Sequence, residues 1–266
     1  MASHSERNAA RKGPRKDFRQ GHQPRFSKGV SDDWLWGWHA VLAALGNPRR
    51  EKPLRIMATA DRARELESRF GRSDVLEIVE GEMISRNLPQ GAVHQGIALR
   101  IPVLEPVPLE DFPADRGAVL LMLDQVTDPQ NVGAILRSAA AFGAKGVILQ
   151  DRHAPKLIGA LAKAAAGAVD AIPTAHVINL SRALEELAEL GWRAVGMDGS
   201  AANPLSEVLD GGPVVIVLGS EGEGLRRLVA EHCDELARIP MPGGFESLNV
   251  SAAAAVTLYE ASRVRA

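Results

Sequence analysis

Residues 214–225 read Val-Val-Ile-Val-Leu-Gly-Ser-Glu-Gly-Glu-Gly-Leu and give the clearest indication of the fold. The first five of these residues are all apolar, which is typical of a strand buried on both faces of a parallel sheet. Three glycines follow within six residues, and glycine lets the backbone come close to a ligand or to another segment of the chain. Glu221 and Glu223 repel phosphate and suit hydroxyl or amine groups on a ligand. The turn is therefore either a binding loop or a solvated connection between a strand and a helix.

The glycine spacing of this turn argues against two common nucleotide-binding motifs. The order is G-x-x-G-x-G, whereas dinucleotide-binding folds use G-x-G-x-x-G, and no Lys-Ser or Lys-Thr pair follows as a P-loop requires. An unrelated nucleotide-binding α/β protein is therefore disfavoured.

Further apolar runs predict three more strands, at residues 118–123, 146–149 and 192–197. Helical patterns separate these runs, and the clearest of them places its leucines on one face between Asn179 as N-cap and Gly191 as C-cap. Strands that alternate with helices predict an α/β domain with a parallel sheet, which we expect to span residues 117–266.

A polar loop follows the predicted strand that ends at residue 123. It reads Asp-Gln-Val-Thr-Asp-Pro-Gln-Asn-Val-Gly over residues 124–133, and a helix is expected at 134–142. We expect Asn131 to be the N-cap of that helix, with Arg137 within two turns. A loop at the carboxyl end of a parallel strand is the usual place for ligand binding in open α/β sheets. The alternative is that Asn131 only caps the helix and Arg137 is only solvated.

A third loop, at residues 239–251, contains two prolines and two glycines that restrict the backbone to a stiff path. Ser247 and Asn249 offer short hydrogen-bonding groups where the final helix, expected at 247–264, begins. Helix capping alone is the alternative role for both residues. Four consecutive alanines in this helix allow close packing, either within the chain or across a dimer.

The front of the chain is organised differently. A small α/β unit is expected at residues 31–104, and a linker rich in proline and acidic residues at 105–116. The expected helices of this unit are 36–45, 61–70 and 82–88, and its expected strands are 54–59, 75–79 and 94–103. Residues 1–30 hold too few apolar side chains to fold alone, so we expect a disordered tail.

The net charge of -2 over 266 residues conceals a division between this tail and the remainder of the chain. The tail holds eight basic and two acidic residues of the chain's 31 and 33, which leaves 23 basic and 31 acidic residues elsewhere. A basic tail on an acidic body indicates either phosphate contact with a nucleic acid or a solubilising segment.

The remaining composition excludes several classes of protein. No run of 18 or more apolar residues predicts a transmembrane helix, and the N-terminal residues lack the apolar core of a secretory signal, so we expect no export. The single cysteine, Cys233, can form neither an intrachain disulfide nor a Cys/His zinc site, so we expect a cytoplasmic protein without a metal.

Taken together and in this order, the three loops resemble the SpoU family of RNA 2′-O-ribose methyltransferases, within the SPOUT superfamily. The resemblance covers residues 118–264 and is carried by Asp-Pro-Gln-Asn-Val-Gly-Ala-Ile-Leu-Arg at 128–137, Leu-Gly-Ser-Glu-Gly-Glu-Gly-Leu at 218–225, and Ile-Pro-Met with Ser-Leu-Asn-Val-Ser within 239–251. Gly-Trp-His-Ala-Val at 37–41 and Ala-Val-His-Gln-Gly-Ile at 92–97 are similar to the family's ribosomal-protein-like RNA-binding domain. This arrangement is typical of members that act on a guanosine of large-subunit (23S) ribosomal RNA.

The resemblance implies a parallel sheet with a deep trefoil knot, S-adenosylmethionine bound in the knot, and a homodimer formed through the C-terminal domain. The implied cofactor-binding residues are Leu218, Gly219, Ile239, Met241, Ser247, Leu248 and Asn249. The implied catalytic residues are Arg137, Asn131, Glu221, Ser247 and Asn249.

Arg137 is the principal catalytic candidate on the family pattern. A guanidinium normally stays charged, which favours a role as a clamp on the neighbouring phosphate over a role as an unusual base. Glu221 would accept a hydrogen bond from Asn131 or hold Arg137. The same motifs are compatible with two alternatives: a transfer-RNA ribose methyltransferase, and a catalytically silent RNA-binding or ribosome-assembly protein.

Overall fold

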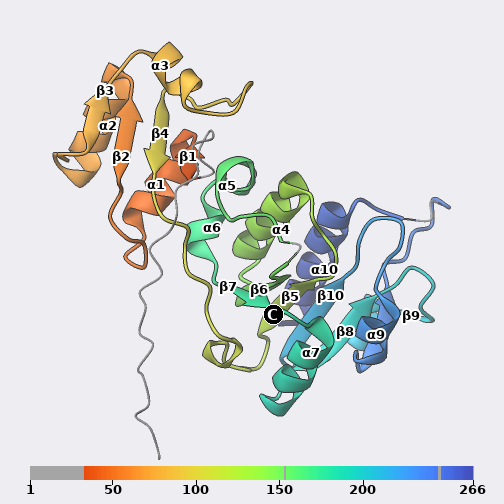
Figure 1. The fold of residues 1–266 in the computed structure, drawn as a ribbon. Helices are drawn as coiled ribbons and strands as arrows, with labels where there is room; N and C mark the ends of the chain where they lie inside the picture. The colour runs from red at the N-terminus through yellow and green to blue at the C-terminus, as the bar shows by residue number, and fades with distance from the viewer. Residues whose placement is uncertain (1–32, 153, 245–246, 266) are drawn as a thin grey trace, which may run out of the picture. The chain divides into compact units, whose positions relative to one another are not determined.

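The structure is a computed structural model that describes residues 33–152, 154–244 and 247–265. The predicted basic tail at 1–30 lies outside these residues, whereas residues 32–266 form one compact unit. Figure 1 shows that this unit contains two β-sheets. No helix among the described residues is long and apolar enough to cross a membrane.

The larger sheet has seven strands in the order β7-β6-β5-β10-β8-β11-β9, and every neighbouring pair is parallel. The strands are β5 (Val119–Leu123), β6 (Gly146–Gln150), β7 (Thr174–Val177), β8 (Arg193–Met197), β9 (Asn203–Pro204), β10 (Val214–Leu218) and β11 (Glu235–Arg238). Every residue of β5 and β10 is buried, as the unbroken apolar runs of these two strands predict. The predicted α/β fold with a parallel sheet is confirmed.

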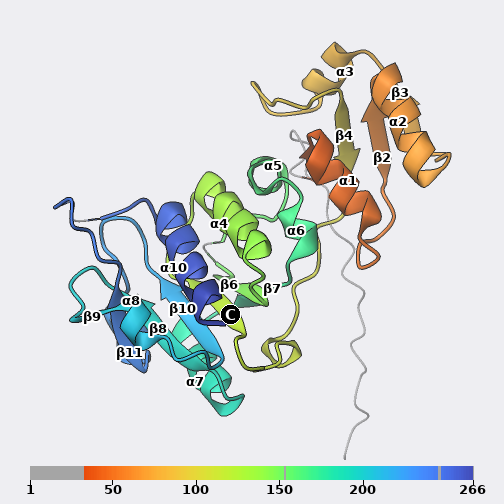
Figure 2. The same ribbon diagram turned by 180° about the vertical axis from the view of Figure 1, so that it is seen from behind.

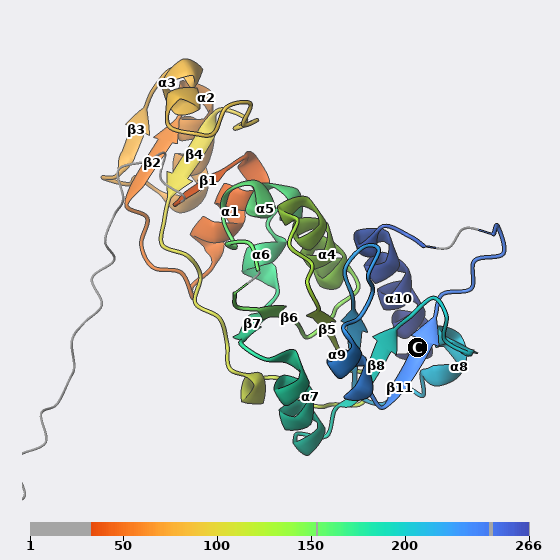
Figure 3. The ribbon, with the colours of Figure 1, turned by 45° about the vertical axis from the view of Figure 1, so that its right-hand side comes forward.

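Helices cover both faces of this sheet, as Figures 2 and 3 show. They are α4 (Pro129–Ala141), α5 (Gly159–Ala165), α6 (Ala168–Ala171), α7 (Leu180–Glu189), α8 (Leu205–Val208), α9 (Arg227–Glu231) and α10 (Val250–Arg265). Leu121 and Ile216 belong to the core that includes α4 and α10, whereas Leu120 and Val215 belong to the core that includes α7. The two cores arise because successive side chains of a strand point to opposite faces.

The smaller sheet has four strands in the order β1-β4-β2-β3, with β4 antiparallel to both of its neighbours. Its strands are β1 (Trp34–Trp36), β2 (Arg55–Ala58), β3 (Leu76–Ile78) and β4 (Ile97–Arg100). The helices of this part are α1 (Trp38–Gly46), α2 (Ala60–Phe70) and α3 (Gly81–Arg86), and a short 3-10 helix, η1 (Leu109–Asp111), follows.

A buried ion pair ties this front part of the chain to α6. Arg50 Nε donates to Asp170 Oδ1 over 2.6 Å, and the two side chains are 1% and 3% exposed. Arg50 Nη2 donates to the second carboxylate oxygen, and Asn47 Nδ2 also donates to Asp170. Removing one partner would leave an uncompensated buried charge, which typically costs about 3–5 kcal/mol.

Several predicted element bounds are wrong, each for a local reason. The helix expected at 36–45 begins at Trp38, because Trp34–Trp36 pairs with β4 as a strand. The final helix begins at Val250 and not at residue 247. The helix expected at 134–142 begins five residues earlier, at Pro129, because Asp128 is its N-cap and accepts a hydrogen bond from the amide of Gln130 over 3.1 Å.

Candidate functional site

A cavity of about 1060 Å³ opens at the carboxyl ends of β8, β10 and β11. This is where ligands bind in open parallel sheets. Eight of the ten residues that the sequence nominates line it: Leu218, Gly219, Glu221, Ile239, Met241, Ser247, Leu248 and Asn249. The other two, Asn131 and Arg137, lie on α4 and are not part of the cavity lining.

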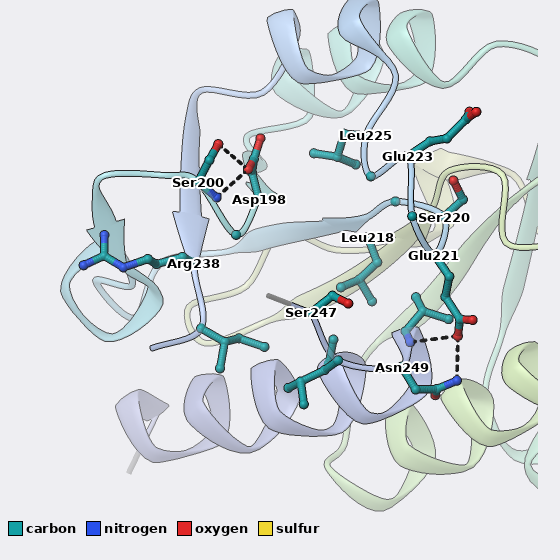
Figure 4. Close-up of a pocket in the computed structure, with 18 of the residues that line it drawn as sticks. Asp198, Ser200, Leu218, Ser220, Glu221, Glu223, Leu225, Arg238, Ser247 and Asn249 are labelled. Atoms are coloured by element: carbon teal, nitrogen blue, oxygen red, sulfur yellow. Dashed lines mark hydrogen bonds between the residues drawn. The ribbon is translucent and has the colours of Figure 1, made fainter. Parts of the chain in front are cut away.

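Glu221 is the centre of a hydrogen-bond network beside this cavity (Figure 4). Its Oε1 accepts from Asn131 Nδ2 over 3.1 Å, from Asn249 Nδ2 over 2.5 Å and from the amide of Val250 over 3.2 Å. Asn249 Nδ2 also lies 3.1 Å from Asn131 Oδ1. The network therefore joins three segments that are far apart in the sequence: the first turn of α4, the glycine turn and the start of α10.

Asn131 does not cap α4, which corrects the expectation from the sequence. Asp128 fills that position, so Asn131 falls within the first turn of the helix. Its amide is thereby available to Glu221.

Asn249 caps α10 and also contacts Glu221. Its Oδ1 accepts from the amide of Ser251 over 3.0 Å and from Ser251 Oγ over 2.6 Å, as a capping side chain does. Its Nδ2 is left to donate to Glu221. Ser247 is exposed at the cavity, and capping of α10 falls to Asn249.

Arg137 is exposed on α4, two turns beyond Asn131. Within the described ranges, its guanidinium forms no hydrogen bond and no ion pair, and Glu221 is bonded to the two asparagines. Of the two partners considered for Glu221, the structure therefore pairs it with Asn131. The five donors of Arg137 remain available to a ligand.

The glycine turn closes on itself. Ser220 and Gly224 exchange two backbone hydrogen bonds, both of 3.1 Å. A Cβ on Gly219 would lie 2.1 Å from the carbonyl carbon of Gly224, so only glycine allows this approach. The closed turn fixes the position from which Glu221 projects.

A buried carboxylate that the sequence analysis missed secures the far end of the same turn. Asp124, which follows β5 and is fully buried, accepts from the amide of Arg226 over 2.9 Å and from Arg226 Nε over 2.7 Å. Arg226 Nη2 also donates to Gln150. The signal available in the sequence was an aspartate directly after a fully apolar strand, where a buried carboxylate needs a partner.

Asp198 and Ser200, in the loop after β8, also line the cavity and were missed. Figure 4 shows them on the other side of Leu218 from the contact between Glu221 and Asn249. Arg238, at the end of β11, is a further lining residue that the sequence analysis did not nominate. The position of Asp198 at the carboxyl end of a parallel strand was the signal that could have found it.

The chemistry of the lining suits a cationic organic ligand. Among the described residues, its charged side chains are three carboxylates, Asp198, Glu221 and Glu223, and one guanidinium, that of Arg238. In the part of the chain that the structure describes, no three His, Cys, Asp or Glu side chains gather as a metal site would require. Cys233 is no nucleophile near neutral pH, because burial raises the pKa of its thiol to about 12.

Comparison with known proteins adds three findings. A profile of the SpoU rRNA Methylase family matches residues 118–259. The 23S rRNA (guanosine-2′-O-)-methyltransferase RlmB of Xylella fastidiosa is 39% identical over 251 residues, an alignment that covers 88% of this chain and 97% of the relative. An uncharacterized tRNA/rRNA methyltransferase of Synechocystis is 38% identical over 88% of this chain, which spans only 63% of that relative's length.

Solved structures agree with the sequence comparison. The AdoMet-bound rRNA methyltransferase from Sinorhizobium meliloti superimposes with a TM-score of 0.71 and 26% identity, covering 86% of each chain.

Proposed function

Since the chain belongs to the SpoU rRNA methylase family, we propose that it transfers the methyl group of S-adenosylmethionine to a ribose 2′-hydroxyl of RNA. A guanosine of large-subunit ribosomal RNA is the proposed target, on the strength of the similarity to the Xylella enzyme. The observation that carries the proposal is the Asn131–Glu221–Asn249 network beside a large cavity, with Arg137, whose guanidinium has no partner among the described residues, on the same helix as Asn131.

The cavity fits the proposed cofactor in size and in charge. Its volume, about 1060 Å³, lies just above the usual range of small-molecule sites, so the cavity has room for the cofactor. S-adenosylmethionine carries a sulfonium and an ammonium, which the three lining carboxylates attract. The peptide groups near Leu218, Gly219, Ile239 and Met241, together with residues 247–249, would hold it. When bound, S-adenosylmethionine supplies a methyl group on a positively charged sulfur that leaves as a neutral thioether.

The residues of the chain must position and activate the RNA hydroxyl that accepts the methyl group. A ribose 2′-hydroxyl is a weak acid, so its oxygen needs stabilisation as negative charge develops and its proton passes to solvent water. We assign Arg137 to the phosphate next to that hydroxyl, because a guanidinium binds phosphate through two parallel hydrogen bonds and retains its charge. Asn131, Glu221, Ser247 and Asn249 orient the groups around the acceptor.

The proposal extends to the path of the chain. We propose that the C-terminal segment forms a deep trefoil knot, with the loop after β11 passing the loop after β10. The contacts of Asn249 and Val250 with Glu221 support this path, as does the close approach at Gly219.

The proposed organisation assigns residues 31–104 to RNA binding, 105–116 to a linker and 117–266 to catalysis, with RNA contact by the basic tail at 1–30. A homodimer through α10 is proposed because apolar side chains on that helix and just before it are exposed. Leu248, Val256 and Tyr259 are 41%, 42% and 55% exposed.

The test is methyl transfer in vitro. Purified protein is incubated with S-adenosylmethionine carrying a labelled methyl group and with unmodified large-subunit rRNA, and the RNA is digested to nucleosides for mass spectrometry. Labelled 2′-O-methylguanosine is the expected product. Label in transfer RNA alone would move the proposal to the alternative substrate, and no label in either RNA would favour a silent binding protein.

A further inference from the structure

The loop after β8 presents a carboxylate to the cavity. One oxygen of Asp198, Oδ1, accepts from the amide and from the hydroxyl of Ser200, each over 2.7 Å. Asp198 is half-buried, and both residues line the cavity (Figure 4). The side chain is therefore held in one orientation at the cavity wall.

The second carboxylate oxygen of Asp198 is unused. Among the described residues, no group donates a hydrogen bond to Oδ2. An ionised carboxylate has acceptor sites on both of its oxygens, and Ser200 occupies only one of them. A ligand in the cavity that offers hydroxyl or amine donors would find an oriented acceptor.

The surrounding loop is fixed before any ligand binds. Arg238 Nη1 donates to the carbonyl of Ala201 over 2.7 Å and also to that of Ala202. Asn203 Nδ2 donates to Glu235 Oε1 over 3.2 Å, and β9 pairs with β11. Because the loop is already ordered, it would lose little conformational entropy when a ligand binds to Asp198.

Building on the proposed function, we propose that Asp198 binds the vicinal ribose hydroxyls of S-adenosylmethionine. Arg137 lies on α4, which follows β5, and Asp198 follows β8. Strand β10 lies between β5 and β8 in the sheet, so the two residues are on opposite sides of it. The reacting end of the ligand must face α4, so its adenosine portion extends toward β8. Two vicinal hydroxyls are two donors and match an acceptor-only carboxylate, whereas the edge of adenine pairs a donor with an acceptor and suits a peptide group.

Calorimetry on the full chain tests this assignment without relying on turnover. The ligands are S-adenosylmethionine, S-adenosylhomocysteine and the 3′-deoxy analogue of the latter, each with wild type and with Asp198→Ala. Glu207→Ala is the matched control, because it removes an exposed carboxylate on α8 outside the cavity lining. Thermal melting of every variant establishes that it is folded.

We expect Asp198→Ala to bind S-adenosylmethionine and S-adenosylhomocysteine about tenfold more weakly than wild type, as loss of a charge-assisted hydrogen bond predicts. Wild type should bind the 3′-deoxy analogue about tenfold more weakly than S-adenosylhomocysteine. Asp198→Ala should bind the two with almost equal affinity, since the variant and the analogue remove the same contact. Glu207→Ala should bind as wild type does.

Two results would overturn the assignment while leaving the proposed function intact. The first is an unchanged affinity in Asp198→Ala. The second is a further tenfold loss of affinity when Asp198→Ala binds the 3′-deoxy analogue in place of S-adenosylhomocysteine. The second result would direct Asp198 to the ammonium group or to adenine. Failure of wild type to bind S-adenosylmethionine at all would instead reject the proposed function and the assignment together.

Discussion

Replacing Glu221 by alanine removes the acceptor that joins α4, the glycine turn and α10. Three hydrogen bonds to this carboxylate are lost, from the side-chain amides of Asn131 and Asn249 and from the backbone amide of Val250, although Asn249 keeps its contact with Asn131 Oδ1. Glu221 is exposed, so each bond is assigned about 1 kcal/mol, below the range for buried charged hydrogen bonds, for a total of roughly 3 kcal/mol. If this energy serves to orient the site, the rate of methyl transfer should fall about a hundredfold.

The assay is single-turnover methyl transfer to rRNA with saturating S-adenosylmethionine, which isolates the chemical step from binding and release. Glu221→Gln should show a smaller loss, of about tenfold, because the amide keeps one acceptor oxygen but lacks the charge. Glu207→Ala serves again as the charge control. A rate for Glu221→Ala within threefold of wild type, in a protein whose melting temperature is unchanged, would refute the role given to the network.

Four further predictions concern separate parts of the chain. Arg137→Ala should lose at least about a hundredfold in methyl transfer while binding S-adenosylmethionine normally, and near-normal turnover would remove Arg137 from the mechanism. Deletion of residues 1–30 should weaken RNA binding and flatten its dependence on salt, whereas an unchanged salt slope would show that the tail makes no phosphate contacts. Light scattering should find a dimer at micromolar concentration that Tyr259→Asp dissociates, and a monomeric wild type would contradict this arrangement. Because the raised pKa of Cys233 keeps its thiol protonated up to about pH 12, iodoacetamide at pH 8 should label native protein far more slowly than unfolded protein, and equal rates would be inconsistent with this burial.

The buried strands could be predicted because short unbroken apolar runs are typical of strands in the middle of a parallel sheet. β10 occupies the predicted residues, Val214–Leu218, with every side chain buried. β11 (Glu235–Arg238) was missed because it mixes charged and apolar residues, and only its pairing with β8 and β9 makes it a strand. The sequence could not supply that pairing, which depends on neighbours more than 30 residues away.

The site could be predicted only in part, because it too depends on contacts between segments that are far apart in the sequence. The motifs nominated Asn131, Glu221 and Asn249, but their meeting depends on how the loops after β5, β10 and β11 converge at one edge of the sheet. The N-cap of α4 was misassigned because Asp128 and Asn131 are both good capping residues, and Pro129 favours the earlier start. Asp198 was overlooked because its strand ends in an irregular loop without a recognisable motif.

We propose that this chain methylates a ribose in large-subunit ribosomal RNA. The most direct measurement is mass-spectrometric mapping of ribose methylation in RNA from a strain that lacks the gene, complemented with wild type or with Arg137→Ala. We predict that one 2′-O-methylguanosine disappears from the large-subunit rRNA, returns with wild type and stays absent with the variant. An unchanged methylation map in the deletion strain would show that the chain does not methylate this RNA.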